Sequence, residues 1–105
     1  MSTPTDDHPD LLTVVASMRA RAGKEQELRQ LLEGLIQPTK QESGCVTYDL
    51  HQGSTDPAVF YFYENWESPD HLDVHMQSSH LQHALGRVDE LLDGPLIIER
   101  LQRIA

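Results

Sequence analysis

Residues 45–66 read CVTYDLHQGSTDPAVFYFYENW, and this segment predicts a β-hairpin. Residues 45–52 are expected to form its first strand. The turn residues GSTDP at 53–57 interrupt the pattern, and the run at 58–66 that follows is rich in aromatic side chains that favour strands. The hairpin therefore supplies two neighbouring antiparallel strands.

The second strand of this hairpin carries large side chains on both of its faces. Phe60 and Phe62 point one way, whereas Tyr61 and Tyr63 point the other way, because side chains alternate along a strand. Neither face is simply polar, so both are expected to contact protein. We expect helices on one face and a second subunit on the other, which predicts a homodimer.

The segment before the hairpin predicts one strand and one helix. Residues 12–21 alternate in polarity as a half-buried strand does, and Gly23 interrupts them. From Lys24 the apolar residues recur at helical spacing. They are Leu28, Leu31, Leu32, Leu35 and Ile36. Pro38 is expected to bend or end this helix.

The segment after the hairpin predicts a split helix and a last strand. Ser-Pro at 68–69 is a helix cap and first turn, and that helix should extend to about Gln77. The serine pair at 78–79 offers the cap of a further helix. Its apolar stripe is Leu81, Leu85, Val88, Leu91 and Leu92. Gly-Pro at 94–95 should end it before a strand at 96–104.

The element order βαββαβ predicts the α+β class with a ferredoxin-like fold, in which helices pack on one face of a four-stranded antiparallel sheet. The chain has 105 residues, which suits one domain, expected at 11–105. Residues 1–10 are polar and acidic, contain two prolines, and are expected to form a flexible tail.

Charge and cysteine content limit the partners and the compartment. Eight Lys and Arg against seventeen Asp and Glu give a net charge of −9, which should repel nucleic acid and anionic membranes. Cys45 is the single cysteine, and no apolar run is long enough to span a bilayer. We therefore expect a cytoplasmic protein with neither nucleic acid nor membrane as a partner.

The candidate site begins where the hairpin ends. Trp66 lies near Glu64, and four of the six histidines follow at 71–83. His75, His80 and Glu64 are candidate acids or bases, while the Trp66 indole can only donate a hydrogen bond. The alternatives are structural: Trp66 as a core anchor bonded to a backbone carbonyl, the histidines as packing or capping groups, and Glu64 as a surface ion.

A metal site is a further interpretation of the histidines. His71 and His75 are four residues apart, and His80 and His83 are three apart, so either pair could share an ion. Neither pair has an evident third ligand in the sequence. We therefore predict no metal site.

Several short motifs resemble the antibiotic biosynthesis monooxygenase domain family. In order along the chain they are RAGK at 21–24, QESGC at 41–45, Tyr48, Glu64-x-Trp66-x-Ser68, His75 and His80. The resemblance covers about residues 11–105. It implies a dimeric α+β barrel whose subunits each hold a cavity for a small molecule. The family's reactions include quinol and polyketide oxygenation, haem degradation and isomerisation of a signalling molecule.

The sequence departs from two branches of that family. In the polyketide-phenol oxygenases that it resembles, the tryptophan acts with an Asn, a Tyr and an Arg, where this chain has Phe62, Leu72 and Gly86. In the haem-degrading branch, Asn, Trp and His stand where this chain has about Ala16, His75 and Leu85. Only Trp66 carries over from the first branch, and haem degradation is disfavoured.

The resemblance and the chemistry together predict a cofactor-independent monooxygenase. No glycine-rich dinucleotide fingerprint is present, so we expect no cofactor, and an electron-rich quinol or polyketide phenol would supply the electrons to dioxygen. A base, an oxyanion donor and a dry apolar wall are then needed. The residues expected to contact this small aromatic substrate are Tyr48, Phe60, Phe62, Leu72 and Met76.

Two other functions stay open on the same residues. One is an isomerase of a small signalling carbonyl compound, and the other is a non-catalytic dimer that binds a small ligand. A phosphorylated substrate would require positive charge in the cavity. The cations available for that are Arg19, Arg21, Lys24 and Arg87.

Overall fold

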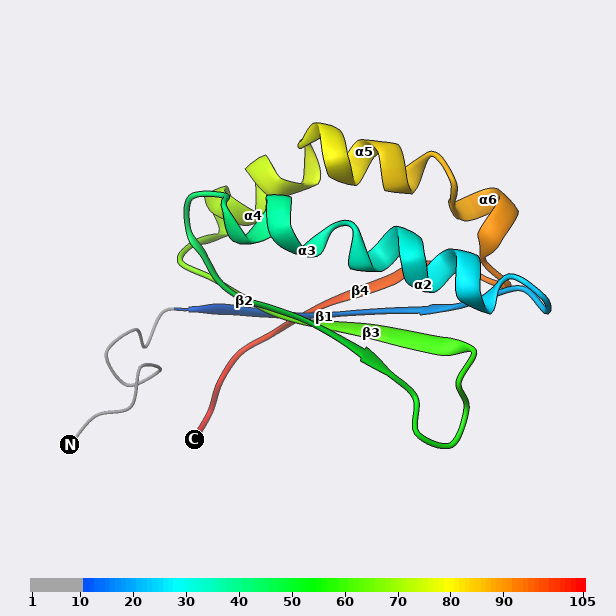
Figure 1. Cartoon of the computed structure of the whole chain (residues 1–105). Coiled ribbons are helices and arrows are strands. Elements are labelled where there is room, and N and C mark those ends of the chain that lie inside the picture. Colours follow the sequence, from blue (N-terminus) through cyan, green and yellow to red (C-terminus); the bar gives the residue numbers. More distant parts are fainter. Residues whose placement is uncertain (1–10) are drawn as a thin grey trace.

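The structure is a computed structural model that describes residues 11–105, so the tail predicted at 1–10 lies outside the described residues. Figure 1 shows the elements in chain order. They are β1 (Leu12–Arg19), α2 (Glu25–Glu33), α3 (Ile36–Lys40), β2 (Cys45–Gln52), β3 (Val59–Trp66), α4 (Pro69–Met76), α5 (Ser79–Leu85), α6 (Val88–Leu91) and β4 (Ile97–Leu101).

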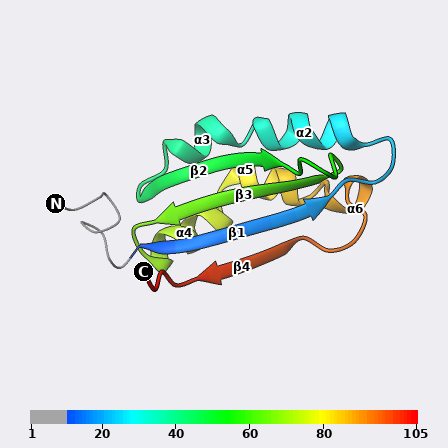
Figure 2. The same cartoon turned by 90° about the horizontal axis from the view of Figure 1, so that it is seen from below.

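The four strands form one antiparallel sheet in the order β2-β3-β1-β4. Figure 1 shows the helices together on one face of this sheet, and Figure 2 shows the other face. The predicted α+β, ferredoxin-like arrangement is confirmed. The strand β1 is central, because it pairs with β3 on one side and with β4 on the other.

The core lies between the sheet and the helices. Trp66 is completely buried, and Phe60 and Phe62 face inward from the same strand. The helices contribute leucines, as the helical spacing predicts. The buried leucines are Leu28, Leu32, Leu35, Leu72, Leu91 and Leu92.

The first helical segment breaks earlier than Pro38 itself. The helix α2 ends at Glu33, and α3 begins at Ile36, so the break includes Gly34. A continued helix would bond the backbone N–H of residue 38 to the carbonyl of Gly34, but proline has no N–H and its ring clashes with that carbonyl. Pro38 is tolerated inside α3 because it lies in the first turn, where the N–H has no helical partner.

The second helical segment has three pieces where two were expected. The Ser68 hydroxyl caps α4 as predicted, accepting from the His71 backbone N–H at 3.3 Å. The apolar stripe expected as one helix is divided into α5 and α6, and Gly86 is the cap between them. The strand β4 ends at Leu101, three residues before the predicted end. No helix within 11–105 is long and apolar enough to cross a membrane.

The sheet face away from the helices carries exposed apolar side chains. Tyr61 and Tyr63 point to this face, opposite to the buried Phe60 and Phe62, as the alternation predicts. Other large apolar residues on the strands are exposed as well. They are Val46, Ile97, Ile98 and Leu101, of which Ile98 alternates to the helix side of β4.

Gly44 lies at a tight crossing before β2. Its φ is +81°, in the left-handed region, and its carbonyl accepts from the Glu67 N–H at 2.9 Å. A Cβ placed on this residue would lie 2.2 Å from Cγ of His71. Only glycine fits here without movement, and this contact holds the start of α4 against the start of β2.

Candidate active site

An apolar cavity of about 60 Å³ lies between the sheet and the helices. Its walls are mainly leucine, valine and alanine side chains, together with methionines and Phe62. Three polar side chains line it: Tyr48, Glu64 and His75. A cavity of this composition is dry, so each of these groups has little competition from water.

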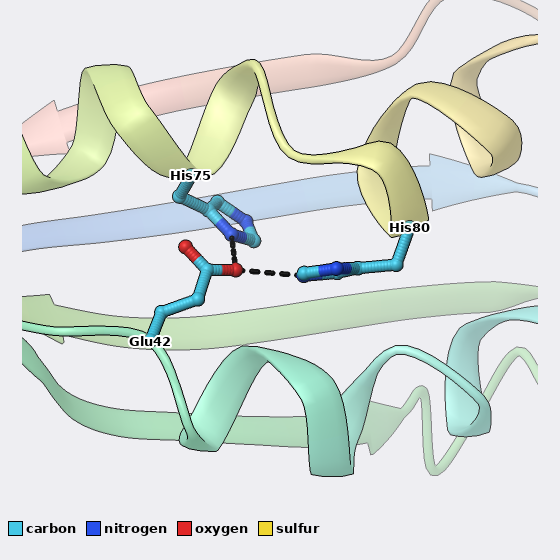
Figure 3. A group of neighbouring side chains, drawn as sticks. All are labelled: Glu42, His75 and His80. Atoms are coloured by element: carbon cyan, nitrogen blue, oxygen red, sulfur yellow. Dashed lines mark hydrogen bonds and ion pairs between the residues drawn. The ribbon is translucent and has the colours of Figure 1, made fainter.

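His75 is held by a carboxylate outside the cavity wall. Its Nδ1 lies 2.8 Å from Oε2 of Glu42, and Nε2 of His80 lies 2.7 Å from the same oxygen. Figure 3 shows the two imidazoles converging on Glu42 from α4 and α5, while Glu42 comes from the segment between α3 and β2. An ionised carboxylate only accepts, so both rings donate N–H to it.

This arrangement fixes the tautomer of His75. Because Nδ1 carries the hydrogen that is donated to Glu42, the neutral ring keeps its lone pair on Nε2. The ring is only 2% exposed and lines the cavity. Burial lowers the pKa of His75, although the hydrogen bond that the ring donates to Glu42 opposes this effect. His75 is therefore a neutral base at neutral pH.

Glu64 is a second candidate acid or base. It lies on β3 and is 4% exposed. Burial raises the pKa of its carboxyl from 4.5 to about 7, against the lowering effect of a hydrogen bond from Trp66. That bond runs from Nε1 of Trp66 to Oε1 of Glu64 over 2.9 Å. The indole thus bonds to a carboxyl group and not to the backbone carbonyl considered as one alternative.

The aromatic rings around His75 hold it in place. The Trp66 ring lies 4.7 Å from the His75 ring, centroid to centroid, and the Tyr48 ring lies 5.4 Å from it at a steep angle. Tyr48 also stacks on Phe62 at 4.4 Å. Burial and the nearby Glu64 raise the pKa of Tyr48, so its phenol keeps its proton and can donate a hydrogen bond.

Six of the nine residues expected at the site line the cavity. They are Tyr48, Phe62, Glu64, Leu72, His75 and Met76. Trp66 and His80 do not line the cavity, and their rings lie next to the ring of His75. Phe60 does not line this cavity; it is buried and borders a separate groove, as Tyr48 does.

Glu42 is a site residue that no local sequence pattern identifies. It is 33 residues from His75 and 38 from His80, so no local spacing connects it to them. The one available signal was its position in the QESGC motif at 41–45, which pointed to the family resemblance and to no role for Glu42. The two histidine pairs considered for a metal do not form such sites: the Nδ1 of His71 bonds to Ser68 at 2.7 Å, and His83 is exposed.

The raised pKa of Glu64 gives a testable dependence of stability on pH. The folded protein holds this proton more tightly than the unfolded chain does, so the free energy of unfolding should fall as pH rises from about 4.5 to about 7. A shift of this size corresponds to roughly 3 kcal/mol. Glu64→Gln should remove this loss, which urea unfolding between pH 5 and 8 would measure.

The exposed acid Glu67 gives a matched control for that experiment, because Glu67→Gln removes a carboxylate close by in the sequence. Burial of His75 has the opposite effect, because its lowered pKa makes the free energy of unfolding rise as pH rises toward 6.5. The quantity to compare is therefore the difference in the free energy of unfolding between wild type and variant at each pH. Parallel curves for wild type and Glu64→Gln would contradict the prediction.

Comparison with known proteins adds a family match. Residues 11–87 match the model of the family described as "Antibiotic biosynthesis monooxygenase". The protein sll1783 of Synechocystis is 27% identical over 90 residues, which are 86% of this chain and 61% of that protein. This chain therefore spans less than two thirds of that relative.

Two further proteins are similar over most of their length. Rv0793 of Mycobacterium tuberculosis, named a "putative monooxygenase", is 34% identical over 87 residues, which are 83% of this chain and 85% of that protein. The crystal structure of PA3566 from Pseudomonas aeruginosa is 33% identical with a TM-score of 0.86, over 90% of this chain and 95% of the other. The solved structure of Rv0793 also has a TM-score of 0.86, at 30% identity, over 91% of this chain and 97% of that one.

Proposed function

Because this chain belongs to the antibiotic biosynthesis monooxygenase family, we propose that it is a cofactor-independent monooxygenase. Its substrate would be a small electron-rich aromatic compound, a quinol or a polyketide phenol, and its second substrate dioxygen. The observation that carries the proposal is the neutral His75, which is held through Nδ1 by Glu42 and lines an apolar cavity. A positioned base in a dry cavity is what phenol activation requires.

The proposed reaction begins with proton transfer. His75 accepts the hydroxyl proton of the substrate on Nε2, and the phenolate then gives one electron to dioxygen. The radical and superoxide combine at a ring carbon to form a peroxide. The O–O bond breaks as that carbon loses its proton, so one oxygen atom stays in the product and the other leaves as water. For a quinol, the products are a hydroxyquinone and one water, and the substrate supplies all four electrons.

Glu64 is suited to the second half of this reaction. A carboxyl group with a pKa of about 7 is partly protonated at neutral pH, so it can donate a proton to the departing peroxide oxygen. Trp66 occupies Oε1 of this group, which leaves Oε2 to carry the proton. His75 thus supplies the base, and Glu64, in a different environment, supplies the acid.

The size of the cavity bears on how a substrate enters. An apolar cavity of about 150 Å³ is the size that binds benzene in another protein, whereas this one measures about 60 Å³. An aromatic substrate therefore enters only if side chains or helices move outward. The helices α4, α5 and α6 have 8, 7 and 4 residues, and short separate helices over the cavity can shift individually.

The isomerase alternative is weakened for phosphorylated substrates. None of the cations considered for a phosphate lines the cavity. Arg19 pairs with Asp56, Arg87 pairs with Glu27 and Glu90, and Arg21 donates to a backbone carbonyl. An isomerase of an uncharged carbonyl compound and a non-catalytic binder remain as outcomes of the test below.

The test is oxygen consumption by the purified protein with a panel of quinols and anthrone-like phenols. We expect uptake of one dioxygen per product formed, with no added metal or flavin. Conversion of a carbonyl substrate without oxygen would favour the isomerase, and ligand binding without any turnover would favour the binder. Either result would contradict the proposed reaction.

We also propose that the protein is a homodimer through the outer face of the sheet and that it acts in the cytoplasm. The support for the dimer is the group of exposed apolar strand residues, among them Tyr63 at 43% exposure. Sedimentation at micromolar concentration should give a dimer, and Tyr63→Glu should give a folded monomer. Val74 on α4 is 66% exposed, so Val74→Glu is a control that should leave the dimer intact. A folded wild-type monomer would contradict this proposal.

A further inference from the structure

We propose that Glu42, His75 and His80 form a binding site for a divalent transition-metal ion such as Zn²⁺, and that the bound ion inhibits the base function of His75. This site would be inhibitory and would not supply a cofactor. The binding part of the proposal stands on the geometry of the three side chains. The inhibitory part rests on the function proposed above.

The three ligand atoms already converge. One ring nitrogen of His75, one of His80 and one carboxylate oxygen of Glu42 all lie within 4.8 Å of one another. Among the residues that the structure describes, this is the one group of three such side chains. The other carboxylate oxygen, Oε1 of Glu42, is buried and has no hydrogen-bond partner within 11–105, so it is available to an ion.

The set of donors indicates the class of ion. Two imidazole nitrogens with one carboxylate oxygen suit Zn²⁺, Co²⁺ or Ni²⁺, whereas Mg²⁺ and Ca²⁺ prefer oxygen ligands alone. Three protein ligands leave a fourth position for water. The Ser78 hydroxyl, 3.2 Å from Nε2 of His80, lies beside this cluster.

Binding requires only a small adjustment. The present N–O separations of 2.8 and 2.7 Å are hydrogen-bond distances. Ligands bound tetrahedrally to Zn²⁺ at about 2.0–2.1 Å stand roughly 3.3 Å apart, so each ring would draw back by about half an ångström. The side chain of His80 is 23% exposed and lies on the seven-residue helix α5, which gives it room to move.

Metal binding changes which nitrogen of His75 carries the proton. The ion takes the lone pair of Nδ1, so a neutral ring must place its hydrogen on Nε2. Without the ion, Nδ1–H bonds to Glu42 and Nε2 keeps the lone pair. The ring that accepts a proton from a substrate in the free protein would therefore be unable to accept one in the metal-bound protein.

The binding test is calorimetric titration of the full chain with Zn²⁺, followed by Co²⁺ as a probe with visible absorption. We expect one ion per chain in a tetrahedral or five-coordinate site. Loss of a group that merely supports a ligand costs about 10- to 100-fold in affinity, so Glu42→Gln and His80→Gln should each cost at least that. His83→Gln is the matched control, because His83 is an exposed histidine on the same helix.

Two outcomes would overturn the metal site: no binding of Zn²⁺ or Co²⁺, or binding that neither variant weakens, which would mean ions held elsewhere on the surface. Circular dichroism identifies a variant that fails to fold. His80→Gln is the variant more certain to fold, because the His80 side chain is partly exposed. Weakening by both variants, with His83→Gln unchanged, supports the site.

Nitrogen NMR of the imidazoles tests the tautomer without any activity assay. The His75 signals should change from the Nδ1–H to the Nε2–H form when Zn²⁺ is added, and His75 should keep the Nδ1–H form in Glu42→Gln. An unchanged tautomer at full occupancy would overturn the inhibitory mechanism. If no substrate supports oxygen consumption, the proposed function fails, while the titration and the NMR still decide on the metal site.

Discussion

Replacing His75 by glutamine should lower the rate of oxygen consumption by roughly 10²-fold or more, because a positioned general base contributes at least that much. Glutamine retains a side-chain N–H for Glu42 but offers no nitrogen lone pair to the substrate. The deficit should shrink at high pH, where the phenol ionises without help. Steady-state rates from pH 6 to 10 would measure both effects.

The control for this variant is His83→Gln, which makes the same change at an exposed position. Trp66→Phe should behave differently again, since it removes the hydrogen bond to Glu64 and part of a buried ring. It should lower the stability of the fold, because Trp66 is a core residue that does not line the cavity. A His75→Gln protein with the wild-type rate and pH profile would exclude His75 as the base and leave Glu64 or His80 as the candidate.

Replacing Gly44 by alanine should destabilise the fold by about 3 kcal/mol. The left-handed conformation costs a residue with a side chain roughly 1–2 kcal/mol, and an overpacked contact costs a similar amount again. The new Cβ would lie 2.2 and 2.4 Å from two ring carbons of His71, so the start of α4 must shift. Urea unfolding with a linear extrapolation measures this change.

Gly23 offers a matched control for the conformational part. Its φ is +86°, close to that of Gly44, but a Cβ there meets nothing within 4 Å. Gly23→Ala should therefore cost only about 1 kcal/mol. In a His71→Ala background the two ring contacts are gone, and Gly44→Ala should cost less than in the wild type. Equal costs at Gly44 and Gly23 would show that the close approach has no energetic role.

Local patterns were sufficient for most of the fold. The strand β2 has the predicted bounds Cys45–Gln52, and the alternation of β3 predicted that Phe62 and Tyr63 lie on opposite faces, as they do. Both results follow from the two-residue period of a strand. The position of the helix break was less predictable, because Pro38 disrupts the helix one turn earlier, at the carbonyl of Gly34.

The candidate site could be predicted only in part, since it depends on contacts between distant segments. Glu64 and Trp66 share a strand face, so the period of two predicts that they meet. The bond from His75 to Glu42 joins segments that only the tertiary fold brings together. A partly buried carboxylate such as that of Glu42 can be identified as a site residue only when its partners are known, and here they come from two different helices.

The central position of β1 also determines the order in which the chain can fold during synthesis. Thr13 in β1 pairs with Leu101 in β4. The first strand of the described structure therefore cannot complete its pairing until the last strand has been synthesised. A ribosome releases β1, β2 and β3 well before β4, and until then one edge of β1 has unpaired backbone groups. Such long-range pairing slows folding. Until residue 101 has left the exit tunnel, the nascent chain has an unpaired strand edge that can pair with other chains and aggregate.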